Sequence, residues 1–235
     1  MGRRTPPWRI STKPYPTALD ALLGLFLYGV KVGRNIVVVA CARSGTKYTS
    51  KVLEAFGFRC GHEDVYGPTF TPERGTNPFK GSSYDMDVSW LAAPHLYSIG
   101  RYADVYHQTR HPLKTVASLL GLGLFNEKHN KLWSRPALKR MPPVDNMTEL
   151  QKCICYYVVW NRLISRYAEN RFKVEDLTTT PEDVLSMMDL PIRMNPILPA
   201  TNLNSRTKGP QIEWGDVTGL FAKPFLAMSE EYGYG

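Results

Sequence analysis

Five consecutive residues combine two cations, two hydroxyls and a glycine in one short segment: Arg43, Ser44, Gly45, Thr46 and Lys47. An uninterrupted apolar run from Ile36 to Ala40 precedes them, and a stretch from Tyr48 to Phe56 with apolar residues at helical spacing follows. A strand, a small polar loop and a helix form the layout that directs backbone N–H groups and a helix N-terminus at an anion. The sequence therefore predicts a phosphate- or sulfate-binding loop.

The segment differs from the loop that binds ATP or GTP in many enzymes, which has the pattern G-x-x-x-x-G-K-[ST]. Gly45 is its only glycine, and Thr46 separates Gly45 from Lys47. The sequence also has no apolar strand ending in an aspartate that would hold Mg²⁺. The alternative is an ordinary turn between a strand and a helix, and a second group of residues makes this alternative the weaker one.

Arg110 and Ser118 form a second candidate anion site. The stretch from Asp104 to Thr109 predicts a strand that ends at Arg110, and Pro112 marks the first turn of a helix that contains Ser118. A guanidinium approaches a phosphate as a rigid fork, and a hydroxyl on a nearby turn adds a further donor. An Arg and a Ser at this spacing are common, so the prediction depends on the two sites occurring together.

Strands and helices alternate along the chain, which predicts an α/β fold: a three-layer sandwich with a central parallel sheet flanked by helices, similar to P-loop NTPases. Further short strands are expected at Phe58–Asp64, Asp87–Leu91 and Phe172–Val174. Further helices are expected at 148–168 with Thr148 as N-cap, at 181–188 and at 216–231, and irregular loops at 66–83 and 121–147. Ligands of such sheets bind beyond the carboxyl ends of the strands, where both candidate sites fall.

The composition fits one α/β domain at 35–235, preceded at 1–34 by a basic, Pro-rich lead and an N-terminal helix. The formal net charge of +8 favours an anionic ligand. No Lys/Arg-rich helix, zinc-binding spacing or repeat is present, which disfavours nucleic acid as the partner.

The four cysteines form no disulfide framework, so we expect buried, reduced thiols and an intracellular, cytoplasmic protein. The apolar run at 18–32 is too short for a transmembrane span. A helix in this run would still allow peripheral association with a membrane.

In this order and spacing, the two sites resemble those of sulfotransferases that use 3′-phosphoadenylyl sulfate (PAPS) as the donor. In that family a [KR]-S-G-T loop after the first strand holds the 5′-phosphosulfate, and an R-x-P-x(5)-S arrangement holds the 3′-phosphate. The resemblance covers roughly residues 35–233. Three further segments also resemble this family: Lys173–Leu177, Asn204–Gly209 and Tyr232–Tyr234.

The resemblance implies that both motifs and a late basic loop bind the donor, through Arg43, Ser44, Gly45, Thr46, Lys47, Tyr48, Arg110, Ser118, Arg206 and Lys208. Arg43 stands where many members carry Lys, and Lys47 where many carry a second Thr. Either cation could therefore act on the bridging oxygen of the donor as its bond breaks, and the sequence leaves this choice open.

The resemblance also implies in-line transfer of SO₃ to a hydroxyl or amine of a carbohydrate or small-molecule acceptor, with the 3′,5′-bisphosphate PAP as product and no metal. The acceptor needs a general base, for which Glu63 is the first choice and His62 the second. His95 and His107 follow. His107 lies within an apolar strand, which is more typical of a core residue.

Two other functions stay open. A nucleotide kinase or hydrolase on a related fold is disfavoured by the absence of the Gly-Lys-Ser/Thr loop and of an aspartate for Mg²⁺. A catalytically inactive nucleotide-binding module is disfavoured because both anion sites and Glu63 are retained.

Overall fold

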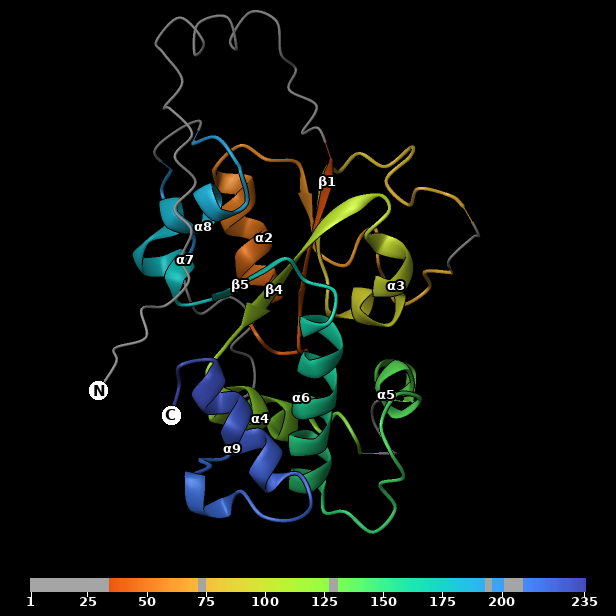
Figure 1. Cartoon of the computed structure of the whole chain (residues 1–235), viewed down its shortest axis with the longest axis vertical. Coiled ribbons are helices and arrows are strands. Elements are labelled where there is room, and N and C mark those ends of the chain that lie inside the picture. Colours follow the sequence, from red (N-terminus) through yellow and green to blue (C-terminus); the bar gives the residue numbers. More distant parts are fainter. Residues whose placement is uncertain (1–33, 72–74, 127–130, 193–195, 201–208) are drawn as a thin grey trace, which may run out of the picture. The chain divides into compact units, whose positions relative to one another are not determined.

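The computed structural model describes residues 34–71, 75–126, 131–192, 196–200 and 209–235. The expected lead and N-terminal helix before residue 34 lie outside these ranges, as do Arg206 and Lys208. In the described part, five strands form one sheet in the order β2-β3-β1-β4-β5, and every pairing is parallel (Figure 1). The strands are β1 (Asn35–Ala40), β2 (Cys60–Gly61), β3 (Met86–Val88), β4 (Ala103–Thr109) and β5 (Asn170–Lys173).

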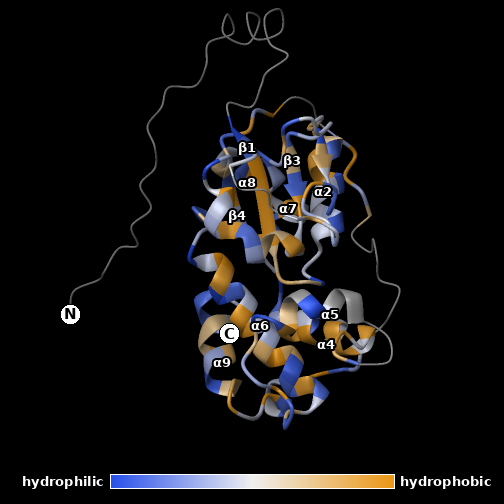
Figure 2. Ribbon diagram, turned by 90° about the vertical axis from the view of Figure 1, so that its right-hand side faces the viewer, coloured by the Kyte–Doolittle hydropathy of each residue, from blue (hydrophilic) through white to orange (hydrophobic). Residues whose placement is uncertain are grey.

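The central strand is β1, which pairs with β3 on one side and β4 on the other. Val37, Val38 and Val39 are each 0% exposed, because helices cover both faces of the sheet at this strand. A strand that is buried on both faces needs apolar side chains at every position, and Figure 2 shows β1 at the hydrophobic end of the colour scale. The apolar run in the sequence was therefore a sound signal for the centre of the sheet.

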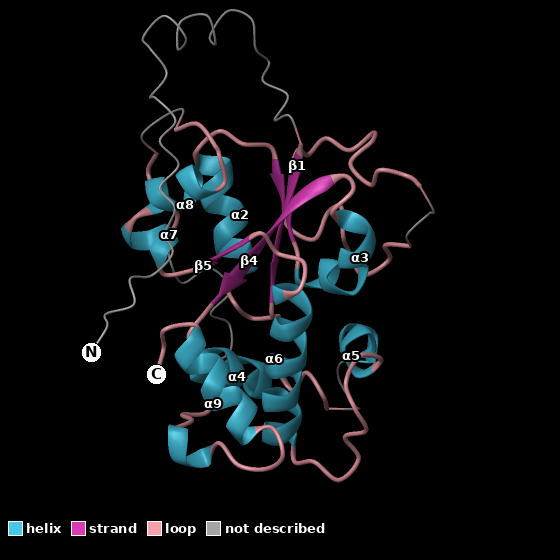
Figure 3. Cartoon of the chain, in the orientation of Figure 1, coloured by secondary structure: helices cyan, strands magenta, loops and turns pink. Residues whose placement is uncertain are grey.

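Helices flank the sheet, as Figure 3 shows, so the predicted α/β fold with a central parallel sheet is confirmed. The α-helices are α2 (Thr46–Ala55), α3 (Leu96–Ile99), α4 (Pro112–Leu122), α5 (Lys131–Leu138), α6 (Glu149–Ser165), α7 (Asp176–Thr179), α8 (Pro181–Met187) and α9 (Ala222–Glu231). Two 3₁₀ helices are η1 (Trp90–His95) and η2 (Trp214–Asp216). In Figure 1, α2, α7 and α8 lie on one side of the sheet and α3 on the other, while α4, α6 and α9 lie beyond the end at which β4 terminates.

The helix α6 begins as expected. The hydroxyl of Thr148 accepts a hydrogen bond from the backbone N–H of Gln151, and the Gln151 side chain accepts one from the N–H of Thr148. This capping box satisfies two donors that a helix end leaves open. The prediction of Thr148 as the N-cap is confirmed.

The expectation of an irregular segment across 121–147 is wrong, because α5 lies within it. Its Lys, Pro and Asn content suggested a loop, but Ala137 is 0% exposed and Met141 is also buried in the core. Burial of an apolar face outweighs weak local propensity in a short helix.

Two element boundaries also differ from expectation. The strand expected at Asp87–Leu91 ends at Val88, where the hydroxyl of Ser89 caps η1 by accepting from the N–H of Leu91. The last helix begins at Ala222 instead of 216, since Gly219 adopts φ +89°, a left-handed conformation that a helix cannot contain.

All four cysteines are free and buried, which confirms the expectation of reduced thiols. In the ranges that the structure describes, no helix has the length and apolarity needed to cross a membrane.

His107 is a core residue, as its apolar strand suggested. It is 1% exposed, its Nε2 lies 2.9 Å from Oδ1 of Asn161, and its Nδ1 lies 3.2 Å from the hydroxyl of Ser165. Burial disfavours the imidazolium and lowers the pKa of His107 from 6.5 to about 4.

We predict an acid-dependent loss of stability from this histidine. Between pH 6.5 and 4 the unfolded chain binds a proton that the folded chain excludes, so stability falls as the pH drops through this window. A gap of about 2.5 pH units corresponds to roughly 3 kcal/mol. Urea denaturation of the wild type and of His107→Gln measures it. The variant should be less stable at pH 7 but lose less on acidification, and parallel curves would contradict the prediction.

Candidate functional site

The loop between β1 and α2 has the backbone of an anion cradle. Arg43 has φ +69° and Gly45 has φ +90°, and Gly45 serves as N-cap of α2 without any side-chain hydrogen bond to the helix. The N–H groups in the first turn of a helix have no partner within the helix. In α2 these belong to Thr46, Lys47 and Tyr48, so their direction and the helix dipole favour an anion here.

A buried glutamine on β4 holds this loop in place. Gln108 is 0% exposed, its Nε2 donates to the carbonyl of Ser44 at 2.6 Å, and its Oε1 accepts from the hydroxyl of Thr49 at 2.6 Å. The N–H of Ala42 also donates to the hydroxyl of Tyr156 at 3.2 Å. Sequence reasoning missed Gln108, although an amide in an otherwise buried strand was the available signal.

The two predicted anion motifs meet at the carboxyl ends of β1 and β4. Nε of Arg43 donates to the hydroxyl of Ser118 at 2.9 Å, and the guanidinium of Arg110 donates to the carbonyl of Arg43 at 2.8 Å. Burial and the charge of Arg110 lower the pKa of Arg43, while burial lowers that of Arg110. Two guanidinium groups and one hydroxyl are therefore brought together from segments that are 67 and 75 residues apart.

The chain returns to this place at Gly209. A Cβ added at Gly209 would lie 2.0 Å from the carbonyl oxygen of Ala117 and 3.1 Å from the backbone nitrogen of Ser118, so only glycine fits against α4 here. Gly209 ends the basic stretch that the sequence analysis singled out. Its Arg206 and Lys208 lie outside the described residues.

The other two segments that resemble the sulfotransferase family, Lys173–Leu177 and Tyr232–Tyr234, contact each other. Nζ of Lys173 donates to the carbonyl of Gly233 at 2.8 Å, and the hydroxyl of Tyr234 donates to a carboxylate oxygen of Glu175 at 2.9 Å. The ring of Tyr234 also packs against that of His111, next to Arg110 in sequence. The chain end thus packs beside the second motif.

On the other side of the loop lie His62 and Glu63, which follow β2. The hydroxyl of Thr46 and Nε2 of His62 are 3.0 Å apart, and the same nitrogen lies 3.7 Å from Oε1 of Glu63. Glu63 has φ +63°, which is unusual for a residue other than glycine, and a Cβ on Gly67 would lie 2.7 Å from the carbonyl of Glu63. A tight turn therefore holds Glu63 close to the loop.

The side chain of Asp87 holds this turn in place. It is 0% exposed in β3, and its carboxylate accepts hydrogen bonds from the backbone N–H groups of Asp64 at 3.2 Å and Tyr66 at 2.9 Å. Sequence reasoning missed this role, although a carboxylate between Met86 and Val88 was a visible sign of a buried polar contact.

The two carboxyl groups have raised pKa values. Burial, followed by the charge of Asp87, raises the pKa of Glu63 from 4.5 to about 7. Burial likewise raises the pKa of Asp87 to about 6, although its hydrogen bonds from backbone N–H groups oppose the change. Burial lowers the pKa of His62, and the charge of Lys47 lowers it further. A carboxyl group with a pKa near 7 can accept a proton at neutral pH.

The remaining predicted residues lie further from this chemistry. The hydroxyl of Tyr48 contacts that of Thr178 at 3.2 Å, so only its backbone belongs to the loop. His95, the last residue of η1, packs edge-on against the ring of Phe70. Both ring nitrogens of His107 lie within hydrogen-bond distance of side chains of α6. Across the described ranges, no group of three or more His, Cys, Asp or Glu residues is arranged to hold a metal ion.

Comparisons with known proteins leave the family undecided. No family model matches the chain, and no curated protein matches it in sequence. Among solved structures, the crystal structure of a sulfotransferase from Alicyclobacillus acidocaldarius resembles it with a TM-score of 0.45 and 14% identity, over 86% of this chain and 96% of that chain. A likeness with so low a TM-score carries no information about activity.

We predict that Asp87→Asn lowers the pKa of Glu63. The variant removes the charge that contributes to the raised pKa but leaves Glu63 buried, so its midpoint should fall below 7 and remain above 4.5. Titration of the Glu63 carboxyl carbon by ¹³C NMR measures this. Asp183→Asn, an exposed position on α8, is the control and should change nothing. An unchanged midpoint in Asp87→Asn would show that Asp87 makes no contribution.

Proposed function

We propose that this protein is a sulfotransferase that transfers a sulfuryl group from PAPS to a hydroxyl or amine of a carbohydrate or small-molecule acceptor. The observation that carries the proposal is the convergence of Arg43, Ser118 and Arg110 beside the loop after β1. In the family that the sequence resembles, these two motifs bind opposite ends of one donor. Their meeting at a single edge of the sheet is what such a donor requires.

The residues present suit that donor. PAPS, when bound, supplies a sulfuryl group activated by its link to a phosphate. The first turn of α2 would hold the 5′-phosphosulfate, because its N–H groups have no partner within the helix and the helix dipole favours an anion. Ser118 and the guanidinium of Arg110 would hold the 3′-phosphate. The resemblance adds Arg206 and Lys208, which lie outside the described residues, as donor-binding groups.

The two cations of the loop then take different parts. Arg43 directs its Nε to Ser118, which favours a role at the 3′-phosphate. Lys47 acts electrostatically on His62 and lies in the first turn of α2, on the side of the candidate base. We therefore assign the stabilisation of the developing charge on the leaving phosphate to Lys47 and to the N–H groups in the first turn of α2.

Glu63 would accept the proton of the acceptor. It lies next to the His62 that contacts Thr46, and its pKa of about 7 leaves a large share of it ionised at neutral pH. His62 would orient Thr46 and Glu63.

The proposed function predicts which ligand stabilises the protein. At 100 times its Kd, 3′,5′-ADP should stabilise the protein by about 2.7 kcal/mol, which is roughly 5–10 °C in Tm for a chain of this size. ATP–Mg²⁺ and 5′-AMP should have smaller effects, because neither presents a 3′-phosphate to Arg110 and Ser118. Thermal shift with the three ligands measures this.

Matched variants sharpen this test. Ser118→Ala and Arg110→Lys should each weaken binding of 3′,5′-ADP about tenfold or more and change binding of 5′-AMP much less. A preference for ATP–Mg²⁺ would favour a nucleotide kinase or hydrolase. Absence of any response to the three ligands would contradict the proposal.

The proposed function also predicts how the rate of transfer depends on pH. If Glu63 is the base, kcat/KM should rise with pH and level off above about 7, because only the ionised carboxylate accepts a proton. Glu63→Gln should lower turnover by about 10²–10⁴-fold and leave binding of 3′,5′-ADP intact. Transfer of ³⁵S from labelled PAPS to an acceptor panel measures it.

The same profile separates the two candidate bases. With His62 as the base, the rise would lie below pH 6.5, since its pKa is lowered. His62→Gln should then have the larger effect. Turnover of Glu63→Gln within a few-fold of wild type would remove Glu63 from the mechanism.

A further inference from the structure

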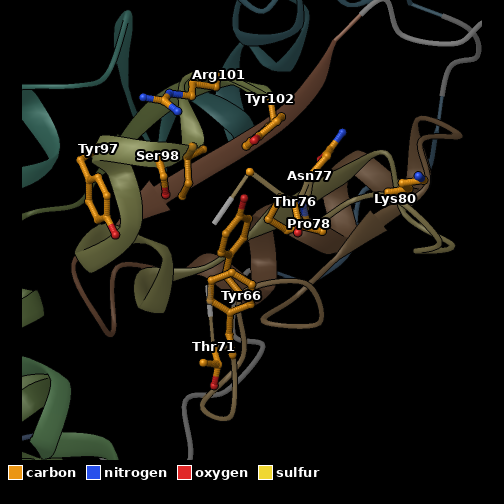
Figure 4. Close-up of a pocket in the computed structure, with 13 residues that line it drawn as sticks. Tyr66, Thr71, Thr76, Asn77, Pro78, Lys80, Tyr97, Ser98, Arg101 and Tyr102 are labelled. Carbon is orange, nitrogen blue, oxygen red and sulfur yellow. The ribbon is translucent and has the colours of Figure 1, made fainter. Parts of the chain in front are cut away.

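A cavity lies away from the loop that follows β1. Its volume is about 550 Å³, and three chain segments line it: 66–71, 75–80 and 97–102. The last two segments precede β3 and β4, so part of the cavity lies toward the edge of the sheet opposite the Arg43 loop. Figure 4 shows the three segments facing one another around it. Pockets of this volume hold small organic ligands.

The hydroxyl of Tyr66 is the unusual atom in this cavity. Tyr66 is 0% exposed, yet its hydroxyl is one of two buried side-chain polar atoms without a hydrogen-bond partner in the described residues. In Figure 4 it points into the space between Ser98 and Thr76. A buried hydroxyl without a partner costs stability, and a hydrogen bond with a ligand would remove that cost.

The other lining groups define the ligand's chemistry. Tyr97 and Phe70 offer aromatic faces, which pack against the C–H faces of a sugar ring. Asn77 can donate from its amide nitrogen, since its Oδ1 already accepts from the N–H of Phe79 at 3.0 Å. The oxygen of Ser98 can accept, since its hydroxyl donates to the carbonyl of His95 at 2.9 Å, and sugar hydroxyls need both kinds of partner.

Charge narrows the choice further. Lys80 and Arg101 are exposed at the rim, and no Asp or Glu is among the described residues that line the cavity. Two cations at the rim favour a ligand that carries negative charge.

We propose that this cavity binds a sugar ring bearing a carboxylate or sulfate group, with the hydroxyl of Tyr66 as a central hydrogen-bonding group and Lys80 and Arg101 attracting the acid group. The proposal does not depend on sulfuryl transfer. The site is nevertheless linked to the loop, because the carboxylate of Asp87 holds the backbone of Tyr66 and of the turn that carries Glu63.

Titration of the full chain with methyl β-glucuronide, followed by ¹H–¹⁵N NMR, tests the proposal. Signals of residues 66–71, 75–80 and 97–102 should shift, and methyl β-glucoside should bind at least five times more weakly. Binding of the glucuronide should weaken with added salt, since the two rim cations are exposed. Equal affinity for the glucoside, tighter binding of 4-hydroxyphenylacetate or no binding at 20 mM (a ceiling of about −2 kcal/mol in affinity) would each overturn the proposal.

Variants locate the contacts. Tyr66→Phe should weaken binding about fivefold and leave Tm unchanged or higher, because the lost hydroxyl has no hydrogen-bond partner among the described residues. Tyr167→Phe is the matched control and should bind as the wild type does. A fall of several degrees in Tm for Tyr66→Phe, with unchanged binding, would assign the hydroxyl a structural role and overturn the proposal.

Further variants test the preference for a charged sugar, and a competing ligand tests whether the cavity is separate from the proposed donor site. The double variant Lys80→Ala/Arg101→Ala should weaken binding of the glucuronide but not of the glucoside, whereas Lys223→Ala on α9 should affect neither. Saturation with 3′,5′-ADP should leave glucuronide binding in place. Competition between the two ligands would overturn a separate site, while failure of 3′,5′-ADP to bind would bear only on the proposed transferase activity.

Discussion

The parallel pairing of β1 with β3 and β4 is the constraint on which the candidate site depends. Because all strands run in the same direction, their carboxyl ends meet at one edge of the sheet. The loop that carries Arg43 leaves this edge from β1, the turn that carries Glu63 leaves it from β2, and Arg110 leaves it from β4. Distance along the sequence therefore has little bearing on which residues meet. This is the general reason why ligands of parallel sheets bind at this edge.

Two buried polar side chains convert this edge into a defined shape. Gln108 holds the loop after β1 through the carbonyl of Ser44 and the hydroxyl of Thr49. Asp87 holds the turn that carries Glu63 through two backbone N–H groups. A buried amide or carboxylate is costly unless its hydrogen bonds are made. The two loops are therefore held by groups that would be destabilising in any other arrangement.

Burial also sets the electrostatic character of the site. It lowers the pKa values of Arg43 and Arg110, and it raises that of Glu63 to about 7. Each change reflects the same cost of removing a charge from water. A bound anion would reduce that cost for the two guanidinium groups. The carboxyl group is left able to gain or lose a proton near neutral pH, which an exposed glutamate would not do.

The sequence alone determined the class of fold and the position of the loop. An apolar run such as Ile36–Ala40 has few uses other than a strand buried on both faces, and Thr148 followed by Gln151 marks a helix start through local bonds. Such features depend on neighbours in the chain, so pattern and propensity suffice. The meeting of the Arg43 loop and Arg110 was predicted from the rule that ligands bind beyond the carboxyl ends of parallel strands, and from the resemblance to a known family.

Only the tertiary structure decided the orientation of Arg43 toward Ser118, the clamps made by Gln108 and Asp87, and the helix α5 within an apparent loop. It also revealed the cavity around Tyr66, for which the sequence carries no motif. The physical reason is the same in each case. These features arise from contacts between segments far apart in the chain, and the free energy of burying a side chain depends on the partners that the fold brings to it.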